Sequence, residues 1–284
     1  MQITFLGTAA SEGYPDVFCG CANCAKALAL GGPSLRKRSA ALINDDLLID
    51  LGPDLMAAAQ MHGVSLAKVT FCLQTHEHDD HLDPTNLIWR SAYSGVTNVP
   101  HLHYYASQGA FAEAKRRLGP QMAERTLFDA EVSTALNLTP HLVEPFQTFT
   151  VGPYCVTSVA ANHDPTLTAM LYVIEQTGRT LFYATDTGEI GEPTWQALHA
   201  GQFRFNLVAM DHTFGLAQRV NGHMNWEQFG EQLDRMRKEG LLAADARILA
   251  HHLAHHSNPP HPELVVFAAQ HGYEVAYDGL RMEV

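Results

Sequence analysis

The pattern of hydrophobic and polar positions predicts a chain that is rich in strands, with helices between them. Short apolar runs bounded by turn residues predict strands, and apolar positions every three to four residues predict helices. The predicted strands lie at residues 2–6, 40–43, 47–50, 68–74, 101–105, 148–161 (broken at 152–153), 169–175, 180–184, 205–210, 247–250, 274–277 and 281–284. The predicted helices lie at residues 54–61, 83–91, 107–118, 193–199, 226–238 and 262–271.

In each half of the chain, the pattern predicts β-hairpins first and strand–helix units after them. Residues 119–147 follow neither period, and we expect a surface insertion there. The sequence contains no repeat, low-complexity segment or linker, so we expect residues 1–284 to form one domain.

Polar residues with metal-binding side chains gather where predicted strands end. Residues 75–81 read Thr-His-Glu-His-Asp-Asp-His and follow the apolar run at 68–74. Asp83 and Pro84 then predict an N-cap and the first residue of a helix. The cluster therefore lies on a tight loop between a strand and a helix. Imidazole and carboxylate groups are the ligands expected for zinc, manganese or iron.

Other predicted strands end in single candidate ligands. His163 and Asp186 each follow an apolar strand, and the strand at 247–250 ends in His251 and His252. A centre with two metals needs about seven ligand contacts, and the histidine loop supplies four of them. His163, Asp186 and one of the two late histidines are the candidates for the rest.

Three cysteines form a separate candidate site near the start of the chain. Cys19, Cys21 and Cys24 have the spacing Cys-x-Cys-x-x-Cys, while Cys72 and Cys155 lie apart. Three thiolates this close make half of a soft-metal site, whose fourth ligand must come from elsewhere in the chain. An odd number of cysteines fits a reducing compartment and metal binding better than a disulfide framework. Free thiols and a disulfide are the alternatives.

Composition and charge restrict the classes of function. The chain has 284 residues, 46% of them hydrophobic, with 30 acidic and 18 basic residues and a formal charge of −12. This balance argues against a nucleic-acid-binding face but allows a small anionic substrate, because bound metals reverse the local field. The N-terminal residues lack a basic start and an apolar signal core, and no apolar run reaches membrane-spanning length. We therefore expect a cytoplasmic protein without a membrane partner.

The histidine loop and the later strand-end residues resemble the metallo-β-lactamase superfamily over almost the whole chain. The resemblance implies an α/β fold, an αββα sandwich of two mixed β-sheets flanked by helices, and a dinuclear hydrolytic centre. By this resemblance one metal would be held by His76, His78 and His163, and the second by Asp80, His81 and the late histidine, with Asp186 bridging both. The late histidine is His252 if it pairs with a second histidine three residues later, and His251 otherwise.

The cysteine loop (residues 19–24) narrows the resemblance to phosphoribosyl cyclic phosphate phosphodiesterases of the PhnP type, which take part in phosphonate breakdown. The shared motifs are Leu6-Gly7-Thr8, Gly13-Tyr14-Pro15, the three cysteines, Asn162-His163, Asp186-Thr187, Asn221-Gly222-His223 and Tyr277-Asp278-Gly279. The resemblance implies a structural zinc on Cys19, Cys21, Cys24 and His255. It also implies two catalytic divalent metals (manganese, zinc or iron), a catalytic role for Asp80, and His223 as the general acid. A helix-capping or surface role is the alternative for His223.

The resulting hypothesis is a metal-dependent phosphodiesterase that hydrolyses a small cyclic phosphate or phosphodiester, such as phosphoribosyl 1,2-cyclic phosphate. Another hydrolase with this fold (a lactonase, thioesterase or tRNA-processing ribonuclease) is the alternative in the same class. A non-hydrolytic protein similar to pyrroloquinoline quinone B proteins is the alternative in another class. The expected partner is a small anionic substrate rather than extended nucleic acid. A homodimer is compatible with the sequence, which does not fix the oligomeric state.

Overall fold

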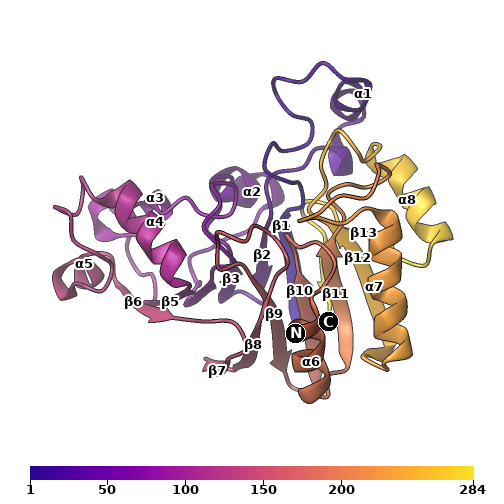
Figure 1. Ribbon diagram of the computed structural model, residues 1–284. Coiled ribbons are helices and arrows are strands. Elements are labelled where there is room, and N and C mark those ends of the chain that lie inside the picture. The colour runs from indigo at the N-terminus through magenta and orange to yellow at the C-terminus, as the bar shows by residue number, and fades with distance from the viewer.

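Two β-sheets packed face to face form the centre of the molecule, and helices cover both outer faces (Figure 1). The computed structural model describes residues 1–284. The expected αββα sandwich of two mixed sheets is confirmed. None of its helices is long and apolar enough to cross a lipid bilayer.

Each sheet has seven strands, and most strands of a sheet come from one half of the chain. The first sheet contains, in spatial order, β14 (Arg281–Glu283), β1 (Gln2–Gly7), β2 (Ala40–Ile43), β3 (Leu47–Ile49), β4 (Phe71–Leu73), β5 (Leu102–Ala106) and β6 (Leu138–Leu142). The second contains β13 (Glu274–Val275), β12 (Leu242–His251), β11 (Phe205–Asp211), β10 (Arg179–Ala184), β9 (Met170–Gln176), β8 (Tyr154–Ala160) and β7 (Thr148–Val151).

The two sheets repeat one order of strand pairing. From β14 to β3, and again from β7 to β10, neighbouring strands are antiparallel; from β3 to β6, and from β10 to β13, they are parallel. Parallel strands of one sheet end at the same edge, so the loops that follow them lie close together. This topology gathers the polar strand ends predicted from the sequence.

Three hydrophobic clusters hold the four layers together. One lies between the two sheets, one between the first sheet and its helices, and one between the second sheet and its helices. The first sheet is covered by α2 (Leu55–His62), α3 (Thr85–Trp89), α4 (Gln108–Leu118) and α5 (Ala130–Ala135). The second is covered by α6 (Glu192–Ala200), α7 (Trp226–Lys238) and α8 (His261–Gln270). Helix α1 (Ala22–Leu30) stands apart at the top of the view in Figure 1.

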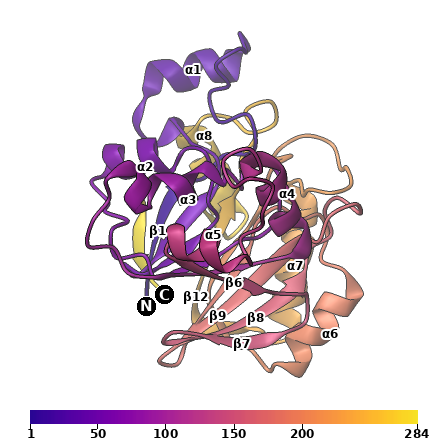
Figure 2. The same cartoon turned by 90° about the vertical axis from the view of Figure 1, so that its left-hand side faces the viewer.

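The predicted surface insertion at residues 119–147 is wrong in its second half. That stretch contains α5 and also β6, which forms the edge of the first sheet (Figure 2). Pro140 and His141 interrupt the alternation of apolar residues in β6, so the strand pattern is weak. An edge strand tolerates proline because one side of its backbone has no partner strand.

Strand and helix ends differ elsewhere by a few residues. Only residues 71–73 of the predicted strand at 68–74 pair as β4, and β12 is longer than predicted. Helix α3 begins at Thr85 rather than at Pro84. The side chain of Asp83 nevertheless accepts hydrogen bonds from the Thr85 backbone N–H at 3.1 Å and from its hydroxyl at 2.6 Å, as an N-terminal cap does.

The end of β1 makes an unusually close backbone contact. The register between β1 and β2 shifts between Phe5 and Gly7, and a Cβ atom on Gly7 would lie 1.9 Å from the Arg38 carbonyl oxygen. The next residue, Thr8, accepts a hydrogen bond on its carbonyl from the Leu253 backbone N–H at 2.9 Å. Glycine at position 7 therefore allows the segment after β1 to reach the loop that follows β12.

We expect Gly7→Ala to destabilise the protein by about 3 kcal/mol, because the added methyl group must displace backbone rather than a flexible side chain. Gly230→Ala is the matched control. Gly230 lies within α7 with open space around the added carbon, so this change should stabilise the protein by about 0.5–1 kcal/mol. Urea unfolding of both variants measures the difference, and equal stability of Gly7→Ala and wild type would contradict the backbone contact.

Candidate metal centre

The loops after β4, β8, β10 and β12 bring all the predicted metal ligands of the catalytic centre together. The structure places them in two groups that share one residue. The first group is His76, His78, His163 and Asp186, and the second is Asp80, His81, Asp186 and His252. Within each group the candidate ligand atoms all lie within 4.8 Å of one another. Their roles as ligands stay predictions, but their arrangement is the one a two-metal centre requires.

In the first group, imidazole nitrogens from two sheets converge on one point. The Nδ1 atom of His78 lies 3.0 Å from His76 Nε2 and 3.0 Å from His163 Nε2. The His76 side chain is buried, whereas 37% of the His78 side chain is exposed. The group is therefore open to solvent on the side of His78.

In the second group, His252 rather than His251 faces the centre. His252 Nε2 lies 3.3 Å from His81 Nε2 and 3.6 Å from Asp80 Oδ2. His251 is the last residue of β12 and points between the sheets, where its Nδ1 atom lies 3.1 Å from the Thr185 hydroxyl. His252 has a φ of 58°, a left-handed conformation that turns its side chain out of the strand direction.

The carboxylate of Asp186 joins the two groups. Its Oδ2 atom lies 3.1 Å from His76 Nε2 and 3.0 Å from His81 Nε2. Its Oδ1 atom is buried and accepts no hydrogen bond, although His223 Nδ1 lies 3.2 Å away. A buried carboxylate with an unpaired oxygen is costly unless a cation accompanies it. Asp186 therefore fits a residue that bridges two metals.

Opposite charges in this cluster fix the protonation states. Burial opposes ionisation of the Asp186 carboxyl, but His252, His76 and His81 outweigh it and hold its pKa well below the usual value. Burial also opposes protonation of the His81 imidazole, yet Asp80 and Asp50 raise its pKa well above the usual value. The carboxylates are thus ionised and available as ligands.

Each buried histidine of the centre is held through its second ring nitrogen. His76 Nδ1 lies 3.0 Å from the Thr75 hydroxyl, and His252 Nδ1 lies 2.8 Å from the Thr213 hydroxyl. His163 Nδ1 lies 3.2 Å from the Gly222 carbonyl oxygen. Such contacts orient metal-binding imidazoles and fix the tautomer that leaves the other nitrogen free. The donor set and its supporting contacts therefore fit two divalent metals.

Asp50 supports the centre, although the sequence analysis did not identify it. The Asp50 carboxylate accepts hydrogen bonds from His81 Nδ1 at 2.7 Å and from the Thr75 backbone N–H at 2.8 Å. It also accepts one from Gln74 Nε2 at 3.0 Å. Asp50 follows the apolar strand β3 and has a φ of 67°. The sequence did contain a signal for Asp50, because it is a polar residue at the end of a predicted strand, as His163 and Asp186 are.

Asp211, at the end of β11, is a second residue that the sequence analysis missed. Its Oδ2 atom lies 3.0 Å from His223 Nδ1, and its Oδ1 atom accepts hydrogen bonds from the Thr213 and Met224 backbone N–H groups at 3.0 Å each. Asp186, Asp211, His223 and His252 also lie close enough to hold a metal. However, Asp211 already accepts hydrogen bonds on both oxygens, so it fits an anchor for His223 better than a ligand.

His223 therefore lies beside the centre, on its solvent side. Its Nδ1 atom is 3.2 Å from Asp186 Oδ1, and 20% of its side chain is exposed. Burial opposes protonation of its imidazole, but the Asp211 carboxylate raises its pKa to about 9. Glu77 and Asp79 belong to neither metal-ligand group.

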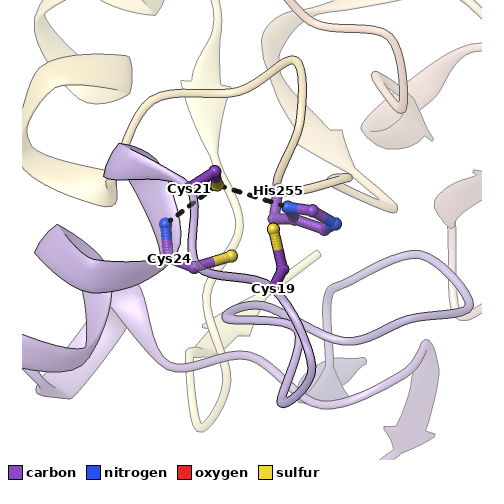
Figure 3. Close-up of side chains that lie close together, drawn as sticks. All are labelled: Cys19, Cys21, Cys24 and His255. Atoms are coloured by element: carbon purple, nitrogen blue, oxygen red, sulfur yellow. Dashed lines mark hydrogen bonds between the residues drawn. The ribbon is translucent and has the colours of Figure 1, made fainter.

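The predicted cysteine site is assembled at a separate place. The thiols of Cys19, Cys21 and Cys24 converge with the His255 imidazole (Figure 3). Cys21 Sγ lies 3.7 Å from His255 Nδ1 and accepts a hydrogen bond from the Cys24 backbone N–H. That N–H and the imidazole lower the pKa of the Cys21 thiol to about 6, which favours the thiolate that binds metals. Four protein donors of this kind fit a closed zinc site.

The cysteine loop is tied to the segment that carries His252. Asn23 Nδ2 donates hydrogen bonds to the carbonyl oxygens of His255 and Asn258, both at 3.0 Å. The Tyr14 hydroxyl donates to the same Asn258 carbonyl at 2.9 Å. A metal on the cysteines would therefore hold the loop after β12 in place.

A family model described as "Beta-lactamase superfamily domain" matches residues 46–252. The chain belongs to the β-lactamase superfamily. The matched residues include both metal-ligand groups, whereas the cysteine loop and His255 lie outside them. In this superfamily, the paired histidine and aspartate groups make the chain a candidate metal-dependent hydrolase.

Solved structures of other proteins resemble the chain over its whole length. A diphosphatase from the PhnP family has a TM-score of 0.75 and 19% identity, covering 100% of this chain and 97% of that one. Zinc-bound PqqB from Methylobacterium extorquens has a TM-score of 0.68 and 20% identity, with 100% of both chains covered. The short form of human tRNase Z has a TM-score of 0.68 and 15% identity, covering 100% of this chain and 99% of that one. No curated protein sequence matches. Identities this low establish the fold alone.

We expect Asp50→Asn to weaken metal binding at the His81 site by about 10–100-fold while the fold persists. Asparagine tolerates the left-handed backbone at this position, but its amide nitrogen cannot accept the His81 Nδ1 hydrogen bond. Chelator competition measures the affinity. Asp45→Asn is the control, because the side chain of Asp45 is exposed and pairs with Lys68 at 3.0 Å, away from the centre. Equal metal affinity of Asp50→Asn and wild type would remove Asp50 from the support of the centre.

We expect Cys21→Ser to release one zinc per chain, lower the melting temperature and increase hydrogen exchange over residues 251–258. The other metals should stay, because the cysteines contact none of their ligands. Elemental analysis, thermal melts and hydrogen–deuterium exchange measure these effects, with Cys155→Ser as the control at an exposed cysteine of β8. A variant that kept this zinc but lost a metal from the Asp186 centre would show that the two sites are wrongly divided.

Proposed function

We propose that the chain is a metal-dependent phosphodiesterase that hydrolyses a small cyclic phosphate or phosphodiester. The leading candidate substrate is phosphoribosyl 1,2-cyclic phosphate. The observation that carries the proposal is the pairing of His223 with Asp211 at 3.0 Å, directly beside the shared carboxylate Asp186. It adds a proton donor to a centre that can hold two metals.

Hydrolysis of a phosphodiester requires a nucleophile, stabilisation of negative charge and a proton for the leaving oxygen. When bound, two divalent metals activate water at neutral pH and neutralise charge on the phosphate. The first group would hold one metal through His76, His78 and His163, and the second group would hold the other through Asp80, His81 and His252. Asp186 would contact both.

His223 is placed to supply the proton. Asp211 accepts the hydrogen bond of His223 Nδ1, so the Nε2 atom is left to face the substrate. A protonated Nε2 can donate to the departing sugar oxygen, which would otherwise leave as an alkoxide. Thioesters release a thiolate that needs such a proton less. The pairing therefore favours substrates with an alcohol leaving group.

The surroundings of His223 favour a small substrate. The Phe214 ring lies 5.7 Å from the His223 ring and 5.6 Å from the His256 ring, between centroids. These side chains form an aromatic wall next to the proton donor, where a leaving sugar would lie. The formal charge of −12 disfavours binding of RNA.

Similarity to the PhnP-family diphosphatase supports a reaction at phosphorus. The proposal extends to zinc or manganese as the catalytic metals, because imidazole and carboxylate accept both, whereas thiolates select zinc. In this role the chain would act on a free anionic substrate in phosphonate breakdown.

We expect His223→Ala to keep its metals and to slow hydrolysis of substrates with alkoxide leaving groups by about 10²–10⁴-fold. Bis(p-nitrophenyl) phosphate should lose far less activity, because nitrophenolate leaves without a proton. Asp211→Asn should show the same selectivity in weaker form. His199→Ala, on the exposed part of α6, is the control.

The test also compares the rates at which the wild-type enzyme hydrolyses four substrates: ribose cyclic phosphate, a linear dialkyl phosphate, a lactone and a precursor tRNA. The proposal requires phosphorus esters of small molecules to be the best substrates of the wild-type enzyme. A preference for lactone or tRNA, or an equal loss on both leaving-group types in His223→Ala, would contradict it.

A further inference from the structure

Two histidines outside the candidate centre form a separate pair at the edge of the first sheet. His103 lies on β5 and His141 on β6, which is the edge strand and pairs only with β5. In the parallel register His141 lies opposite Tyr105, two residues beyond His103, so all three side chains share one face. This face looks toward β7 of the second sheet, because the Tyr105 ring stacks on the Phe149 ring of β7 at 5.5 Å between centroids.

The two imidazoles are as close as those of the candidate metal centre. His103 Nδ1 lies 3.0 Å from His141 Nε2. The corresponding nitrogen pairs in the centre are 3.0 Å apart for His76 and His78, and 3.3 Å apart for His81 and His252. With metal–nitrogen bonds of about 2.0–2.1 Å, the 3.0 Å spacing gives a nitrogen–metal–nitrogen angle of roughly 90–97°. That angle suits square-planar or octahedral geometry better than tetrahedral geometry.

Aromatic neighbours hold both rings in this position. The His103 ring stacks on Phe71 at 5.8 Å with 27° between the planes. The His141 ring stacks on Tyr105 at 4.3 Å with 11° between the planes. Rings fixed in this way lose little conformational freedom when a metal joins them. The pair is thus pre-organised.

In the structure His103 Nδ1 and His141 Nε2 share one hydrogen bond, so a bound metal would take the place of its proton, which the second nitrogen of the donor ring would then carry. Both side chains are half-buried, so a metal ion can reach them from solvent. Burial lowers the pKa of both imidazoles, and so does charge on neighbouring histidines, which keeps both rings neutral at pH 7. The neighbouring His101 differs, because its ring nitrogens lie 2.9 Å from Asn137 Oδ1 and 2.8 Å from the Thr139 hydroxyl. His101 is therefore not counted as a ligand.

We propose that His103 and His141 form a two-histidine site for a divalent transition metal that prefers nitrogen ligands and right-angle geometry, namely Cu²⁺ or Ni²⁺. The site is distinct from the candidate catalytic centre. It lies beside Phe71 at the start of β4, whereas the histidine loop follows the end of that strand. A bound metal would fasten the edge strand β6 to β5.

The experiment titrates Cu²⁺ into the metal-loaded wild-type protein and records electron paramagnetic resonance spectra and thermal melts. The expected result is one additional Cu²⁺ per chain with two nitrogen ligands and a higher melting temperature. His103→Phe and His141→Phe keep a ring for stacking but remove the nitrogen atoms. Each should weaken this Cu²⁺ binding by about tenfold or more and abolish the metal-dependent rise in melting temperature.

His101→Ala is the matched control, because it removes an exposed histidine from the same face and should leave the added Cu²⁺ bound. Melts without added copper show whether each variant is folded, and elemental analysis shows whether the resident metals remain. The proposal is overturned if wild type binds no additional Cu²⁺, if copper only replaces resident metals, or if both phenylalanine variants bind it as wild type does. Loss of the added Cu²⁺ in His101→Ala would also contradict the assignment of the site to His103 and His141.

Discussion

The position of one carboxylate oxygen, Asp186 Oδ2, constrains how the strand ends of both sheets are arranged around the candidate metal centre. Asp186 Oδ2 lies within 3.1 Å of imidazoles from both metal-ligand groups. Burying a carboxylate in this way is favourable only when positive charge or metal surrounds it. The two sheets must therefore present their strand ends to a single point, and the repeated order of antiparallel and parallel pairing brings those ends to one edge. The three hydrophobic clusters between the layers hold the two sheets in the positions that this arrangement requires.

Unusual backbone conformations occur where the chain turns toward this point. Asp50, Asp186 and His252 all have positive φ values, of 67°, 65° and 58°. Residues other than glycine rarely adopt this left-handed conformation, which costs about 1–3 kcal/mol. The chain's other eight such residues lie outside the centre. At each of the three positions the chain leaves a strand abruptly, which turns the side chain back over the sheet edge. Aspartate is among the residues that accept such a turn most readily.

The sequence predicted the donors of the centre better than the residues that hold them. His76, His78 and His81 stand in one dense motif, and His163 and Asp186 end clear apolar strands, so the pattern marked them as candidates, and the structure brings them together. Asp50 and Asp211 are single aspartates whose importance depends on hydrogen bonds to residues distant in sequence, such as His81 and His223. No local spacing encodes such contacts. Strand β6 was missed for a related reason, because an edge strand with proline and histidine carries little of the alternation that identifies strands.

The antiparallel pairing of β1 with β14 has a consequence for how the protein is made. Residues near the start of the chain pair with the last strand, Gln2 opposite Glu283, and both termini lie side by side in Figure 1. During synthesis the first half emerges early, but the outer edge of its sheet lacks β14, and the loop that carries His252 and His255 has not yet been added. A ribosome-bound chain thus exposes an unpaired strand edge together with the three thiols of the cysteine loop. The interval before β14 and the loop after β12 emerge is the period in which aggregation or oxidation competes most directly with correct folding.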